Sequence, residues 1–287
     1  MKNPEVSNVL VLGLARNVAS TIQRDMLALQ KALAGFKRTN FLILESDSND
    51  STLGVLEQLT KEVANFRYIS IGELCDQIPN RIDRISYCRN KLLESANKYA
   101  EEVDFVVVVD LDGVNTKITR AAIESCWQRD DWEVCTANQE FNYYDIYALR
   151  HETLCPNDCW NEYHELRKAR LHPMKARQIS IYSRQIHIPQ ESAWIRVNSS
   201  FGGLAIYDSN SYFSSGYASR DSEGSLICEH VALHQRIESS GGRIYINPKM
   251  INSSGIRKYS LKYKLFYGVK YSFSAIAPNL FVRRFGE

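Results

Sequence analysis

The sequence lacks the features that mark several large classes of protein. Its 35 lysine and arginine residues exceed its 33 aspartate and glutamate residues by only two, so bulk charge does not favour nucleic-acid binding. No apolar run is long enough to span a bilayer, and the first residues, MKNPEVSN, do not resemble a signal peptide. The seven cysteines are odd in number and lack framework spacing, which favours a reducing compartment. We therefore expect a cytoplasmic protein.

The chain also has no internal repeat and no Gly/Ser-rich linker between its two parts. With 287 residues and 44% hydrophobic content it is able to bury one sizeable core. We predict one domain made of two continuous halves, residues 1–140 and 141–256, followed by a tail at residues 257–287. The tail holds seven basic residues and one acid, interleaved with tyrosine and phenylalanine. This mixture suits peripheral contact with an anionic membrane surface, and a solvated helix with one packed face is the alternative.

Strand and helix patterns alternate along the first 140 residues. Apolar runs predict strands at residues 9–14, 41–44, 66–71, 106–109 and 134–137. Helical spacing of apolar residues predicts helices after Ser20 and at residues 53–63, 84–99 and 121–127. Such alternation predicts an α/β protein with a mostly parallel sheet, whose ligands gather beyond the carboxyl ends of the strands.

The stretch VVVVDLDGVN, residues 106–115, describes a buried strand that delivers Asp110 and Asp112 to that edge. It resembles the opening motif of the haloacid dehalogenase superfamily, but there the motif lies on the first strand, whereas here three predicted strands come first. The alternative is an Asp-x-Asp that holds a divalent metal against a nucleotide-sugar diphosphate, with hard oxygen ligands for Mn²⁺ or Mg²⁺. The order of elements favours this second chemistry. Two solvated carboxylates at a strand end remain the simpler interpretation.

Seven stretches in order resemble the GT-A-fold glycosyltransferases, and more narrowly the capsule-associated (cryptococcal) α-mannosyltransferase family. They span from about residue 9 to residue 250 and read LARNVASTI, ILESDSNDST, RISYCRNKLLE, VVVVDLDGV, ANQEFNYYDIYALR, SSFGGLAIY and CEHVALH. The resemblance implies a GT-A-like fold, with a mixed, mostly parallel central sheet flanked by helices. It makes residues 1–140 the nucleotide-sugar-binding half and residues 141–256 the acceptor-side, catalytic half.

The resemblance assigns donor-binding roles to residues at the strand ends. Contact with the base or ribose falls to Ala15, Arg16, Asn17 and Glu45. Arg84 and Arg89, on one predicted helix, suit a diphosphate because a guanidinium binds it with two parallel hydrogen bonds, although solvated helix charges are the alternative. Asp112 is assigned to the metal directly, and Asp110 to the ribose or a metal-bound water.

The second half supplies candidates for the sugar and acceptor side. FNYYDIYALR alternates like a strand, which would place Asp145 on one side between Tyr143 and Tyr147, suited to gripping sugar hydroxyls; the tyrosines are otherwise core residues. Gly202 and Gly203 predict a close-packed loop near the donor sugar, with backbone amides open to a ligand.

The helix start at CEHVALH carries an acidic residue and two histidines. By resemblance, Glu229 is the acceptor-side catalytic carboxylate and His230 a metal ligand. His230 and His234 at i and i+4 are alternatively a zinc pair or packed core residues. A second zinc alternative involves His151, Cys155, Cys159 and His164, against plain packing or a disulfide.

These observations predict a metal-dependent transfer of a sugar from a nucleotide sugar, by resemblance mannose from GDP-mannose. The acceptor is a saccharide or lipid-linked saccharide of capsule, lipopolysaccharide or another surface glycan. The resembled family retains the anomeric configuration, but the residues alone allow an inverting base as well. Two alternatives stay open. A sugar nucleotidyltransferase would usually carry a glycine- and lysine-rich loop where this chain has LARNVAST, and a non-catalytic carbohydrate-binding descendant would keep the same fold.

Overall fold

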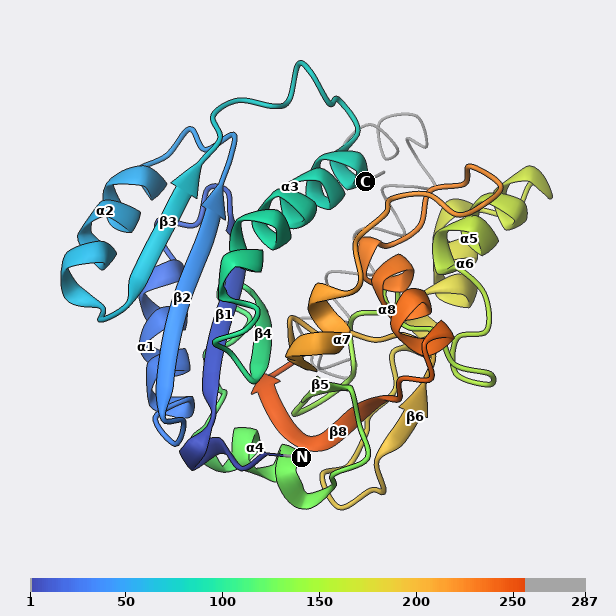
Figure 1. The fold of residues 1–287 in the computed structure, drawn as a ribbon. Coiled ribbons are helices and arrows are strands. Elements are labelled where there is room, and N and C mark those ends of the chain that lie inside the picture. Colours follow the sequence, from blue (N-terminus) through green and yellow to red (C-terminus); the bar gives the residue numbers. More distant parts are fainter. Residues whose placement is uncertain (1, 256–287) are drawn as a thin grey trace.

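The strands of the computed structural model, which describes residues 2–255, join into one sheet. The sheet has the order β3-β2-β1-β4-β7-β5-β8-β6 (Figure 1). Its strands are β1 (Asn8–Ala15), β2 (Arg38–Glu45), β3 (Phe66–Ser70), β4 (Phe105–Asp110), β5 (Val134–Gln139), β6 (Ile195–Val197), β7 (Leu204–Asp208) and β8 (Ile244–Ser253). Four pairings between these strands are parallel and three are antiparallel. The predicted mixed, mostly parallel α/β sheet is confirmed.

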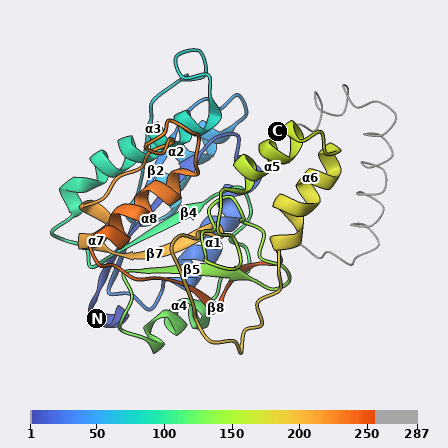
Figure 2. The ribbon, with the colours of Figure 1, turned by 90° about the vertical axis from the view of Figure 1, so that its right-hand side faces the viewer.

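Helices cover both faces of this sheet. The α-helices are α1 (Ile22–Ala32), α2 (Thr52–Glu62), α3 (Arg81–Ala96), α4 (Arg120–Glu124), α5 (Cys159–Lys168), α6 (Pro173–Ser180), α7 (Ser209–Phe213) and α8 (Glu229–Ser239). Short 3₁₀ helices lie at Pro4–Val6, Asn97–Tyr99, Ser125–Gln128 and Tyr182–Arg184. Helices α1, α2 and α4 share one apolar core with the sheet, while α3, α7 and α8 share the core on the other face. Figures 1 and 2 show α5 and α6 standing out from the sheet.

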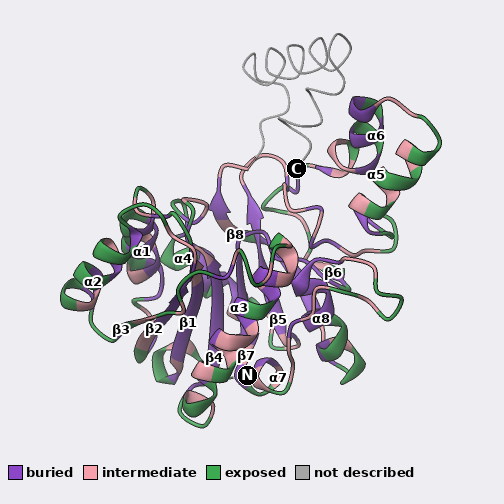
Figure 3. Ribbon diagram, turned by 90° about the horizontal axis from the view of Figure 1, so that it is seen from above, coloured by how far each residue is buried: buried purple, intermediate pink, exposed green. Residues whose placement is uncertain are grey.

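The valine run forms the middle of the sheet, as its composition predicts. Strand β4 pairs in parallel with β1 and antiparallel with β7. Val106 and Val108 enter one core while Val107 and Val109 enter the other, so both faces are buried. A strand covered on both sides reads as an unbroken apolar run because neither face meets water. Figure 3 shows the sheet buried between its two helical layers.

The direction of the strands brings polar residues to one edge. Ala15 pairs with Glu45 where β1 and β2 end, and Leu14 of β1 pairs with Asp110 of β4. Strand β7 runs the opposite way, so its start reaches the same edge, where the Asp110 N–H donates to the Gly203 carbonyl at 3.0 Å. Segments from both halves of the chain therefore meet at the carboxyl ends of β1 and β4.

The strand predicted across residues 141–150 is wrong. These residues form turns and isolated bridges. Ile146, Ala148 and Leu149 are all buried, so burial does not alternate along the segment. The Asp145 carboxylate accepts the Ala148 N–H at 3.3 Å and closes a turn that strand geometry would not allow.

Within residues 2–255 no helix has the length and apolar character needed to cross a membrane. The basic and aromatic tail at residues 257–287 lies outside the described residues, so its contact with a membrane surface stays a prediction.

Helix α8 buries a histidine against the sheet. His234 is fully buried, and its two ring nitrogens lie 2.9 Å from the Ser199 hydroxyl and 3.0 Å from the Tyr207 hydroxyl. Burial lowers the pKa of His234 to about 3. The folded protein therefore keeps this ring neutral at pH values where an unfolded chain would protonate it.

We expect His234→Gln to reduce the free energy of unfolding more at pH 8 than at pH 5. Below pH 6.5 His234 is protonated in the unfolded wild-type chain but stays neutral in the folded one. The free energy of unfolding therefore falls by about 1.4 kcal/mol for each unit by which the pH drops. Glutamine does not titrate and escapes this loss. Urea unfolding at the two pH values measures the difference. The exposed His187, substituted in the same way, is the control, and an equal loss at both pH values would contradict the assignment.

Candidate active site

A cavity of about 520 Å³ opens at the carboxyl edge of the sheet. It brings together every predicted site residue except Glu45, Gly202 and Gly203. The predicted residues that line it are Ala15, Arg16, Asn17, Arg84, Arg89, Asp110, Asp112, Asp145, Glu229 and His230. They come from the end of β1, from α3, from the end of β4, from the 141–150 turns and from α8. Residues far apart in the sequence thus face one space.

Asp110, the last residue of β4, and Asp112, in the loop that follows, reach this cavity from a segment that hydrogen bonds hold in place. The Asn115 amide donates to the carbonyls of Asp110 and Gly203 at 2.7 and 3.0 Å, and it is fully buried. The Asp110 side chain is 39% exposed and Asp112 is exposed. Burial raises the pKa of Asp110 to about 7, with Arg89 opposing the rise and Asp112 adding to it. The site concentrates negative charge at a strand end.

Helix α1 supports that loop through a residue that the sequence analysis missed. The Asp25 carboxylate is fully buried and accepts the Gly113 N–H at 2.7 Å, while the Thr21 hydroxyl donates to the Leu111 carbonyl at 2.9 Å. Gly113 has φ of 96°, and a Cβ there would lie 3.1 Å from the Arg24 guanidinium. Burial raises the pKa of Asp25 to about 6. An aspartate on the apolar face of the predicted helix was the available signal.

Arg89 joins the two halves of the site. Its Nη2 lies 3.1 Å from Asp110 Oδ1 and its Nε lies 3.9 Å from Glu229 Oε1. The guanidinium carbon also lies 5.6 Å from the centre of the Phe201 ring. Arg89 is 3% exposed, and its Nε and Nη1 have no hydrogen-bond partner within residues 2–255. A buried cation thus links the strand-end acid to the acid that begins α8.

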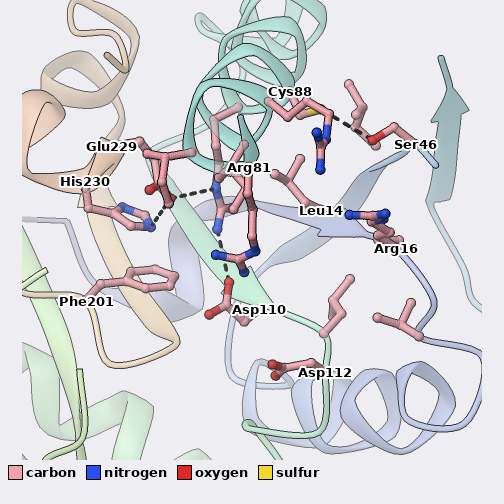
Figure 4. A pocket seen from close by; sticks show the side chains of 18 of the residues that line it. Leu14, Arg16, Ser46, Arg81, Cys88, Asp110, Asp112, Phe201, Glu229 and His230 are labelled. Atoms are coloured by element: carbon pink, nitrogen blue, oxygen red, sulfur yellow. Dashed lines mark hydrogen bonds and ion pairs between the residues drawn. The ribbon is translucent and has the colours of Figure 1, made fainter. Parts of the chain in front are cut away.

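His230 lies on the α8 side of the cavity. Its ring stacks on Phe201 with centroids 3.8 Å apart, and its Nε2 is 3.4 Å from Glu229 Oε1. Burial lowers the pKa of His230 well below its usual range. Figure 4 shows it beside Phe201 and Glu229, whereas Asp112 lies beyond Asp110. His230, Asp110 and Asp112 line the same cavity, but residues 2–255 contain no group of three or more His, Cys, Asp or Glu side chains placed to hold a metal ion.

The opposite wall is built by the loops after β1 and β2. Arg16 Nε donates to the Asp47 carbonyl at 3.4 Å, and Arg84 Nε lies 3.6 Å from Asp47 Oδ2. The same carboxylate accepts the backbone N–H groups of Leu74 and Cys75 at 2.7 and 2.8 Å. Partial burial raises the pKa of Asp47, but its hydrogen bonds with Cys75 and Leu74 outweigh this and leave it below its usual value. Asp47 therefore positions the two arginines at the cavity wall.

Glu45 does not line the cavity. It is 2% exposed, and its carboxylate accepts the Ser48 N–H at 3.0 Å and the Ser70 hydroxyl at 2.5 Å. In this structure the Glu45 carboxylate connects the ends of β2 and β3, and its predicted contact with a base or ribose stays a prediction.

Gly202 and Gly203 stand behind the cavity wall, where close packing requires glycine. Their φ angles are 70° and 86°. A Cβ on Gly202 would lie 2.8 Å from the Ala137 carbonyl oxygen, and one on Gly203 would lie 2.8 Å from the Tyr144 hydroxyl. The Gly202 N–H donates to Asp145 Oδ2 at 3.0 Å and so holds a carboxylate that lines the cavity. Burial raises the pKa of Asp145 to about 6.

The cysteines and histidines of residues 151–164 make packing contacts and do not form one ligand cluster. Cys155 and Cys159 are free and buried in the core, and Cys155 Sγ lies 3.3 Å from Arg184 Nη1. The His151 ring accepts the backbone N–H groups of Thr153 and Leu154 at 3.1 and 3.2 Å. These contacts agree with the packing alternative for the cysteines.

No family model and no curated protein matches this chain in sequence. Among solved structures, it is similar to the mannosyltransferase PcManGT from Pyrobaculum calidifontis, determined in complex with GDP-Man and Mn²⁺, with a TM-score of 0.53 and 12% identity over 97% of this chain. The chain spans 66% of that protein's length. A further neighbour is S. aureus TarS 1–349 in complex with UDP-GlcNAc, with a TM-score of 0.48 and 12% identity over 93% of this chain and 66% of that one. Another is glucosyl-3-phosphoglycerate synthase from Mycobacterium tuberculosis in complex with UDP, with a TM-score of 0.42 and 12% identity over 88% of this chain and 72% of that one. At these identities the comparison establishes the fold, which is that of GT-A-type glycosyltransferases.

Proposed function

We propose that the chain is a metal-dependent glycosyltransferase that moves mannose from GDP-mannose to a saccharide or lipid-linked saccharide acceptor of a surface glycan. The observation that carries this proposal is the charge pattern of the 520 Å³ cavity. Arg16, Arg81, Arg84 and Arg89 face it together with Asp110, Asp112, Asp145 and Glu229. Arginines suit a diphosphate, and carboxylates at a strand end suit a hard divalent cation.

The acid pair fits Mn²⁺ or Mg²⁺ in its chemistry. Asp110 at the end of β4 and Asp112 in the loop that follows offer oxygen ligands at the cavity. Mg²⁺ sites at phosphate substrates are often built from one or two carboxylates, with substrate oxygens and water completing the coordination. A cation held there offsets charge on the leaving diphosphate.

The remaining cavity residues position the donor and acceptor. Arg16 and Arg84, steadied by Asp47, neutralise the diphosphate from the β1 and α3 side. Glu229, at the start of α8, contacts the acceptor hydroxyl and accepts its proton. Asp145, held by the Gly202 N–H, binds hydroxyls of the transferred sugar. Arg89 keeps the Glu229 and Asp110 carboxylates in place between these two tasks.

The donor is the finer part of the proposal. GDP-mannose is supported by the sequence resemblance and by the GDP-Man and Mn²⁺ bound to PcManGT, whose fold this chain shares.

Incubation of the purified chain with a panel of nucleotide sugars and Mn²⁺ tests the activity. We expect release of nucleoside diphosphate, fastest with GDP-mannose. Release with another donor alone would retain the glycosyltransferase and reject mannose. Pyrophosphate as the product would indicate a sugar nucleotidyltransferase, and no turnover with any donor would favour a non-catalytic carbohydrate-binding protein.

Asp112→Asn tests the metal role. The substitution keeps the size of the side chain but removes the charge that the cation needs, so we expect the rate of nucleoside diphosphate release to fall at least about a hundredfold. Asp130→Asn, on an exposed turn before β5, is the matched control and should leave the rate unchanged. Full activity of Asp112→Asn would remove Asp112 from the metal site.

Arg89→Lys tests the bridge between the two acids. Lysine keeps the positive charge but has one ammonium group in place of a planar fork, so it will not hold Asp110 and Glu229 together. We expect kcat to fall at least about tenfold, because the reacting groups lose their alignment. Arg120→Lys, on the exposed side of α4, controls for the exchange itself. Kinetics indistinguishable from wild type would show that charge alone is required.

A further inference from the structure

A second cavity, of about 450 Å³, adjoins the candidate active site. Ile82 and Tyr147 line both cavities, so the two spaces share a wall. The second cavity continues between α5 and the loop that precedes α8. Its other lining residues are Trp160, Asn161, His164, Arg220, Ser225 and Leu226. The resemblance places residues 141–256 on the acceptor side in general, but the proposed transfer chemistry assigns no task to this groove.

The aromatic wall of the groove is fixed from outside the cavity. The guanidinium carbon of Arg177 lies 5.5 Å from the ring centres of both Trp160 and Tyr163. Tyr163 meets Trp160 edge to face, with centroids 5.6 Å apart and an interplanar angle of 82°. Arg177 is 6% exposed, and neither it nor Tyr163 lines the groove. The Trp160 ring is therefore half-buried and held in one orientation at the groove wall.

Polar side chains surround the rings. Asn161 and His164 are exposed on α5, one turn of helix or less from Trp160. Across the groove, Arg220 lies 3.1 Å from Asp83 and donates to the Gly224 carbonyl at 3.0 Å. Together these groups provide amide, imidazole and guanidinium hydrogen-bond partners around the rings of Tyr147 and Trp160.

This combination matches the surface of a sugar. A pyranose ring presents an apolar face of C–H groups, which an aromatic ring covers, and a rim of hydroxyl groups, which planar polar side chains bind. A purely apolar ligand would leave the polar rim unpaired, at a cost for each desolvated group. Because Ile82 and Tyr147 line both cavities, an extended ligand at this shared wall would contact both spaces.

We propose that this groove, lined by Tyr147, Trp160, Asn161, His164 and Arg220, binds sugar residues of the acceptor glycan next to the residue that receives the transferred sugar. The inference rests on the proposed glycosyl transfer, because only in a transferase is the bound glycan an acceptor. It makes α5 and the loop before α8 the elements that select the glycan.

Binding to an array of microbial and mammalian glycans tests the groove. We expect the labelled full chain, with GDP and Mn²⁺ present, to bind at least one glycan. Trp160→Ala should bind the same glycan at least about tenfold more weakly. Trp194→Ala is the matched control, because that half-buried tryptophan packs on Tyr245 at 6.0 Å and lines neither cavity. Trp160→Phe keeps a ring and should recover part of the affinity.

Two further measurements keep the test decisive. If Trp160→Ala does not fold, the double variant Asn161→Ala/His164→Ala, on exposed positions, must weaken glycan binding instead. No glycan bound by the wild type, or equal binding by the groove variants and the wild type, would overturn the proposal. Nucleotide-sugar turnover is measured separately, so glycan binding through Trp160 without turnover would reject the transferase and keep the groove as a carbohydrate site.

Discussion

The candidate site depends on one buried cation, Arg89, placed between two carboxylates. Asp110 is delivered by the central strand β4 and Glu229 by the start of α8, and only the tertiary fold brings them within 3.1 and 3.9 Å of the same guanidinium. Removing one partner from a buried ion pair leaves an uncompensated charge, which is costly in a low-dielectric interior. The acid that ends β4 and the acid that begins α8 are therefore coupled through α3, and the alignment of the two sides of the site is a property of that contact.

Sheet direction explains why the chemistry gathers where it does. Parallel β1 and β4 end at one edge, and the antiparallel β7 begins there, so Ala15, Asp110 and Gly203 become neighbours although they are distant in sequence. The buried Asn115 then ties the loop after β4 to the start of β7. The loop that carries Asp112 is held from below by α1, through Asp25 and Thr21. The exposed Asp112 carboxylate thus stands on a loop that hydrogen bonds from Asn115 and to Asp25 hold in place.

Sequence reasoning recovered strands β1 to β5 and most of the cavity, because both follow from strong local signals. The valine run could only be a buried strand, and the acids that end it had to reach the strand's carboxyl edge. The predictions failed where tertiary contacts determine the local structure. Residues 141–150 have the alternating pattern of a strand but form turns, because the Asp145 carboxylate accepts hydrogen bonds from the N–H groups of Ala148 and Gly202. Asp25 has no motif, since its partner Gly113 is 88 residues away. Glu45 lies at the predicted edge, but its carboxylate is engaged by Ser48 and Ser70, a choice that no pattern reveals.

The buried carboxyl groups of the site also lower the free energy of unfolding at neutral pH. Burial raises the pKa of Asp25 and Asp145 to about 6 and that of Asp110 to about 7. For a carboxyl whose folded pKa exceeds its unfolded value, the contribution to stability is greatest at low pH and is lost as pH rises through the folded pKa. At neutral pH Asp25 and Asp145 are mostly ionised and Asp110 is about half ionised, so their charge destabilises the fold, and Arg89 offsets part of this cost at Asp110. A bound cation would favour the ionised carboxylates at the cavity, so the arrangement that costs stability in the free protein is the one that gains most from its ligand.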